Sequence, residues 1–63
     1  MSEREANFER MLSFVQEQYE RTTRKMEELK AQGKTKTATY RQLLGDKLYY
    51  QKLLSLYKTF DLL

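Results

Sequence analysis

Apolar side chains recur through the first half of the chain at alternating intervals of four and three residues. The series is Phe8, Leu12, Val15, Tyr19, Met26 and Leu29, with Thr22 filling the one gap. An α-helix turns once every 3.6 residues, so this spacing places the series on one side of a helix. Ser2 followed by Glu5 is typical of a helix start, because these side chains can bond the first free backbone N–H groups. The pattern predicts a helix over about residues 3–32.

A short turn-forming segment follows this helix. Gly33 stands where a helix C-terminus needs a residue that tolerates a positive φ, and Thr35 or Thr37 can cap a second helix. We expect the second helix to run over about residues 36–62. A link of about two to four residues forces neighbouring helices to run antiparallel. The sequence therefore predicts an all-α fold: a single domain over residues 1–63 that forms a two-helix antiparallel hairpin.

The second helix carries an apolar series with the same spacing, and the two series can be aligned. If residues whose numbers sum to 69 face each other, five of the seven partners on the second helix are apolar. The pairs are Phe8–Asp61, Leu12–Tyr57, Val15–Leu54, Tyr19–Tyr50, Thr22–Lys47, Met26–Leu43 and Leu29–Tyr40. The one polar position in the middle of each series then meets the other, which supports this register.

Each predicted helix also has a second apolar stripe that a single seam leaves uncovered. At about 100° per residue, this stripe lies roughly 120° around the second helix and roughly 100° around the first. Because the helices run in opposite directions, both rotations lead to the same side of the hairpin. We call this predicted surface the apolar face. It comprises Met11, Phe14, Tyr49, Leu53, Leu56, Phe60 and Leu63.

An apolar face of this size predicts a partner. Burying one such side chain contributes about 1.5 to 3 kcal/mol, so leaving seven in water forgoes on the order of 10 kcal/mol, comparable to the stability of a small domain. We expect two hairpins to pack these faces together as a homodimeric four-helix bundle. The alternative occupant is an amphipathic helix of another protein.

The residue types argue against catalysis and against the usual staples of small domains. The 63 residues include neither Cys nor His, so disulfides are excluded and the commonest catalytic base and nucleophile are missing. The carboxylates are not grouped with other ligands, and we expect no metal and no cofactor. The chain is predicted to be a small non-enzymatic protein-protein interaction or regulatory module.

Basic residues gather near the predicted turn and suggest a second function. Residues 21–41 carry a net charge of +5, whereas residues 1–20 carry −3. A dimer would present two such clusters, enough to attract a phosphate backbone, so nucleic-acid binding is the alternative. The macrodipole also favours cations at a helix C-terminus, which explains part of the cluster without any ligand. Its members are Arg21, Arg24, Lys25, Lys30, Lys34, Lys36 and Arg41.

Hydropathy predicts no membrane span, since no stretch approaches the roughly 20 apolar residues that a crossing requires. The acidic N-terminus, with Glu3 and Glu5, has no apolar stretch behind it and predicts no secretory signal. A cytoplasmic location is therefore expected. The second helix has cations without acids on its polar side, as membrane-surface helices do, but the register places two of them, Lys52 and Lys58, beside glutamates of the first helix.

Overall fold

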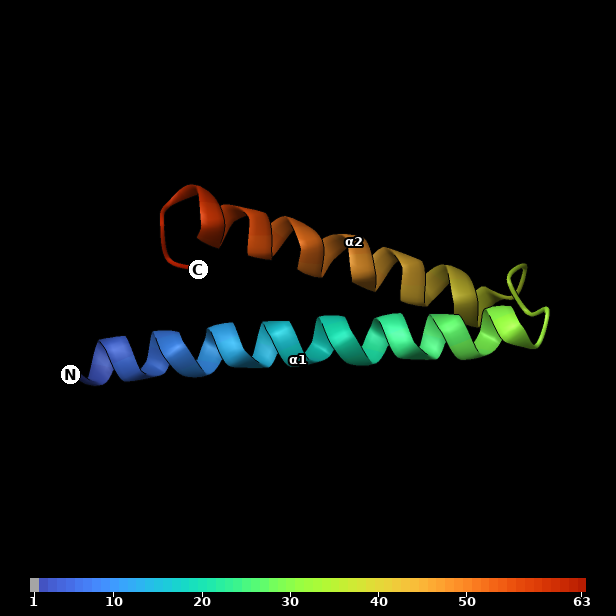
Figure 1. Cartoon of the computed structure of the whole chain (residues 1–63), viewed down its shortest axis with the longest axis horizontal. Coiled ribbons are helices and arrows are strands. Elements are labelled where there is room, and N and C mark those ends of the chain that lie inside the picture. Colours follow the sequence, from blue (N-terminus) through green and yellow to red (C-terminus); the bar gives the residue numbers. More distant parts are fainter. Residues whose placement is uncertain (1) are drawn as a thin grey trace.

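The computed structural model describes residues 2–63, which form two helices. Helix α1 spans Glu3–Ala31 and helix α2 spans Ala38–Thr59. The helices run antiparallel and pack against each other along their length, and they lie closest near the turn (Figure 1). The predicted all-α helical hairpin is confirmed.

Both ends of α1 are closed by the residues that the sequence singled out. The Ser2 hydroxyl accepts a hydrogen bond from the Glu5 backbone N–H at 3.1 Å and lies 3.3 Å from the Glu5 carboxylate, to which it can donate. At the other end, Gly33 has φ +72°, and its N–H donates to the carbonyl of Lys30. The Lys34 N–H donates to the carbonyl of Leu29 at 2.8 Å. This pair of bonds is the Schellman motif, in which a glycine reverses the chain and satisfies the last carbonyls.

Thr37, rather than Thr35, caps α2. Its hydroxyl accepts from the Tyr40 N–H at 3.2 Å and donates to the carbonyl of Lys34 at 3.0 Å. The cap is thereby tied to the end of α1, and the link occupies residues 32–37. The link is longer than predicted because α2 starts two residues later than residue 36.

The C-terminal end of α2 differs from the prediction. The helix stops at Thr59 instead of near residue 62, because Asp61 adopts φ +56°. The N–H groups of Asp61 and Leu62 donate to the carbonyls of Lys58 and Tyr57, which forms a second Schellman motif. The last residues turn back toward α1 (Figure 1).

The seam between the helices is more deeply buried on α1 than on α2. Leu12, Val15, Thr22 and Met26 are buried, and all four belong to the series that the spacing predicted. No residue of α2 is buried to the same degree. Its seam residues are half-buried. They are Tyr40, Leu43, Lys47, Tyr50, Leu54 and Tyr57.

Two contacts show where the register holds and where it shifts. Gln51 Nε2 donates to the Tyr19 hydroxyl at 3.2 Å, within one residue of the predicted alignment. Near the open end, Phe8 packs edge-on against Tyr57 with ring centroids 5.5 Å apart. Phe8 was predicted to face Asp61, one turn further along, but Asp61 lies beyond the helix in the reversing turn.

The hairpin is elongated. Its principal extents are 46 × 18 × 15 Å and its radius of gyration is 14.3 Å. A compact chain of this length has a radius of gyration of about 10.6 Å by the usual scaling. A two-helix hairpin has no third element to cover its sides, so much of each helix remains in contact with solvent.

Candidate protein-protein interface

The apolar face is exposed in the structure. Six of its seven predicted members have exposed fractions between 47 and 69%; the seventh, Leu53, is half-buried. Leu63 lies beyond the end of α2, so it does not continue the helical stripe as predicted, although it is 55% exposed. Phe60 occupies the C-cap and is 69% exposed. The helical part of the face is therefore formed by Met11, Phe14, Tyr49, Leu53 and Leu56.

A groove between the helices lies on the same side of the hairpin as the apolar face. It is lined by Gln18, Arg21, Thr22, Arg24, Lys25, Glu28, Leu43, Asp46 and Tyr50. By helical rotation, Phe14 lies between Gln18 and Arg21 on α1, and Leu53 lies beside Asp46 on α2. The apolar face and the groove thus share one side, with the apolar residues toward the open end and the polar groove toward the turn.

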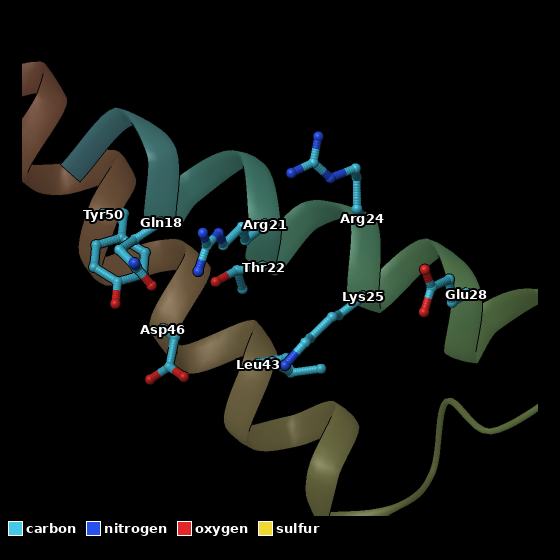
Figure 2. A pocket seen from close by; sticks show the side chains of 9 residues that line it. All are labelled: Gln18, Arg21, Thr22, Arg24, Lys25, Glu28, Leu43, Asp46 and Tyr50. Atoms are coloured by element: carbon cyan, nitrogen blue, oxygen red, sulfur yellow. The ribbon is translucent and has the colours of Figure 1, made fainter. Parts of the chain in front are cut away.

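The groove carries both signs of charge in close proximity. Arg21 and Lys25 extend from α1 on the side where Asp46 lies on α2 (Figure 2). Arg21 pairs with Glu17 on its own helix at 2.8 Å, and this is the one ion pair within residues 2–63. Asp46 accepts a hydrogen bond from Gln42 Nε2 at 3.2 Å. Its carboxylate therefore has no cationic partner inside the described hairpin.

Two exposed leucines on α2 were missed by the sequence analysis. Leu44 and Leu48 are 41 and 56% exposed. They lie about 100 to 140° around the helix from the seam, on the flank opposite Leu53. Their spacing of four residues was the available signal, but two positions are too few to stand out as a stripe.

The predicted basic cluster does not form a single surface. All seven side chains are exposed. Arg21, Arg24 and Lys25 line the groove on one side of the hairpin, whereas Lys30 lines a hollow beside Tyr40 on the other. Arg24 points away from α2 (Figure 2). The basic side chains are therefore spread around the turn end of the hairpin and do not share one face.

Across residues 2–63, no three acidic, His or Cys side chains lie close enough together to hold a metal ion. In the same part of the chain, no helix is both long and apolar enough to cross a membrane.

The fold and its exposed surface define a class: an all-α helical hairpin with an apolar face on one side and two exposed leucines on the opposite flank of α2. No protein-family model, curated protein or solved structure matches the chain. The function must therefore be argued from the surface itself.

Proposed function

We propose that this chain is a small, non-enzymatic protein-protein interaction module that works as a homodimeric four-helix bundle. The observation that carries the proposal is the exposure of large apolar side chains on one side of the hairpin. Large exposed apolar patches mark interaction surfaces, and closed two-fold dimers are the commonest assemblies.

The area that the hairpin exposes beyond that of a compact monomer is close to the area that one subunit buries in a dimer. The hairpin exposes 5230 Å². Folded monomers of 7.7 kDa expose about 4,300 Å² by the usual scaling of surface with mass. The excess, about 900 Å², is close to the roughly 800 Å² that each partner buries in a standard interface. A standard interface with a second copy would therefore cover an area close to this excess.

Charge substitutions on the apolar face test the proposal. Phe14→Glu together with Leu56→Glu replaces two side chains that are 57 and 47% exposed, so the seam inside the hairpin stays intact. We expect this variant to sediment as a monomer, because two carboxylates per subunit would have to be buried on association.

The matched control is Leu44→Glu together with Leu48→Glu, which places the same charges on the opposite flank of α2. We expect this control to remain dimeric. Loss of the dimer in the control alone would mean that the interface lies on that flank. A wild-type monomer that binds an amphipathic peptide through Phe14 and Leu56 would instead identify a helix of another protein as the occupant.

Nucleic-acid binding is the second candidate, and it is supported by seven exposed cations around the turn end. Only Arg21 among them is held in an ion pair within the described hairpin. Fluorescence anisotropy with labelled DNA and RNA at about 50 mM salt tests this candidate, since phosphate contacts are strong at low salt. Absence of binding under those conditions removes it.

A further inference from the structure

We infer that the two hairpins of the dimer pack with their turns at the same end, so that Asp46 of each subunit faces Arg21 and Lys25 of the other. This inference rests on the proposed homodimer. It goes further by assigning the dimer an orientation and a specific polar contact.

The interacting side of the hairpin is divided into two unlike halves. Its open-end half is apolar, whereas the turn-end half is the groove that carries Arg21, Lys25 and Asp46. In a symmetric interface, apolar residues must therefore face apolar residues of the partner, and charged groups must face opposite charges.

The level of each group along the hairpin determines which groups of two subunits can meet. Leu43, Asp46 and Tyr50 line the same groove as Gln18, Arg21 and Lys25, so these stretches of α2 and α1 lie at one level. By the same antiparallel progression, Leu56 lies level with Met11 and Phe14 nearer the open end.

Two-fold symmetry then determines which groups of the two subunits face each other. If the axis runs along the hairpin, the turns lie together, and α2 of one subunit packs on α1 of the other at an unchanged level. Leu56 then meets the partner's Met11 and Phe14, so apolar residues meet apolar residues. Asp46 meets the partner's Arg21 and Lys25, which supply the cation that its carboxylate lacks within the hairpin.

The opposite orientation leaves Asp46 without a cationic partner. With the turns at opposite ends, the two-fold axis crosses the hairpins at right angles to their length. The apolar halves then overlap only if this axis passes near the level of Phe14. On α1 this brings Lys25 level with the partner's Glu3. Helix α2 packs on α2, however, so Asp46 lies away from the partner's Arg21 and Lys25 and its carboxylate still lacks a cation.

Placing the turns together has one electrostatic cost. It brings two basic turn ends to one end of the bundle, where Lys34 and Lys36 of each subunit are exposed. Solvent screens exposed charges beyond about 8 to 10 Å at physiological ionic strength, so these lysines can spread apart in water. The Asp46 contacts lie between packed helices and are screened less.

A distance measurement between spin labels tests the orientation. Because the chain has no cysteine, Thr35→Cys provides a single labelling site in the turn. With helices packed about 10 Å apart, turns at the same end put the two labels below about 30 Å. Turns at opposite ends separate them by on the order of 50 Å, given a rise of 1.5 Å per residue.

Ser55→Cys is the matched control. This exposed residue lies on the opposite flank of α2 but level with the middle of the apolar half, so its two labels are little separated along the long axis in either orientation. A long Thr35 distance with a short Ser55 distance overturns the inference and leaves the proposed dimer standing. No dipolar coupling from either label at micromolar concentration overturns the dimer, and the orientation with it.

Charge reversal tests the polar contact separately. We expect Asp46→Lys and Lys25→Asp each to raise the dimer dissociation constant about tenfold, and the double variant to regain most of that loss. The expected pattern requires both single variants to retain wild-type helicity by circular dichroism. Unchanged dissociation constants in both single variants would overturn the contact.

Discussion

At the residue scale, the two glycines differ in whether the hairpin needs them, and Gly45 is the one that it does not need. It lies inside α2, and a Cβ built on it meets no heavy atom within 4 Å. Gly33 has equally open space but a φ of +72°, which other residues adopt only with strain. Only Gly33 is therefore required by the backbone of the hairpin.

We predict that Gly45→Ala raises the free energy of unfolding by about 1 kcal/mol, because glycine is that much less favourable than alanine inside a helix. Urea denaturation at fixed protein concentration measures the change. Gly33→Ala is the control, and we expect a loss of similar size, roughly 1 kcal/mol. A less stable Gly45→Ala protein would mean that a helix of the partner crosses closely at this point.

The Tyr57 hydroxyl is the second informative group. It is buried without a hydrogen-bond partner, while its ring packs edge-on against Phe8. We predict that Tyr57→Phe stabilises the protein by about 1 kcal/mol, since it removes an unsatisfied polar group and keeps the ring contact.

Tyr19→Phe is the matched control for Tyr57→Phe. It removes the hydroxyl that accepts a hydrogen bond from Gln51, so we expect a loss of about 0.5 to 1 kcal/mol. Thermal unfolding of the two variants measures both changes in stability: the gain expected for Tyr57→Phe and the loss expected for Tyr19→Phe. Destabilisation by Tyr57→Phe as well would show that its hydroxyl has a partner in the assembled protein.

At the element scale, the two helices contribute unequally to the hairpin. The buried side chains all belong to α1, and α2 lies on them with half-buried residues. Helix α2 therefore keeps more apolar surface available for a partner than α1 does. This asymmetry agrees with the larger share of the apolar face that α2 supplies.

Leucine-to-alanine substitutions test this asymmetry. We predict that Leu12→Ala, which removes a buried side chain, lowers the free energy of unfolding by roughly 2 kcal/mol or more. Leu44→Ala removes the same atoms from a side chain that is 41% exposed, and we expect a change within about 0.5 kcal/mol. Denaturant unfolding of both proteins gives the comparison. A large loss from Leu44→Ala would place that residue in a buried contact.

Periodicity predicted both helices, because burial of one face of a helix selects apolar residues at the 3.6-residue repeat, but it missed the exposed Leu44 and Leu48 on the other flank of α2. It did not predict where α2 ends. The stop depends on the backbone of Asp61, and a Leu-Leu pair after it reads equally well as a continuing stripe. Thr35 and Thr37 were equivalent as caps because only three-dimensional contact shows which hydroxyl reaches Lys34 and Tyr40.

At the scale of the whole molecule, the elongated shape of the hairpin and the exposure of its apolar face have the same explanation. Two helices make a single contact layer, and a second layer is needed to cover the side that the first leaves open. A second copy supplies that layer and adds width without adding length. The 46 Å long axis of one hairpin is therefore also the expected length of a dimer whose turns lie together.

Sedimentation equilibrium of the wild-type chain at micromolar concentration tests the central claim most directly. We predict a helical species with twice the monomer mass of 7.7 kDa, which dissociates on dilution and whose thermal stability rises with protein concentration. A well-folded species that stays at 7.7 kDa throughout the micromolar range would contradict the homodimer.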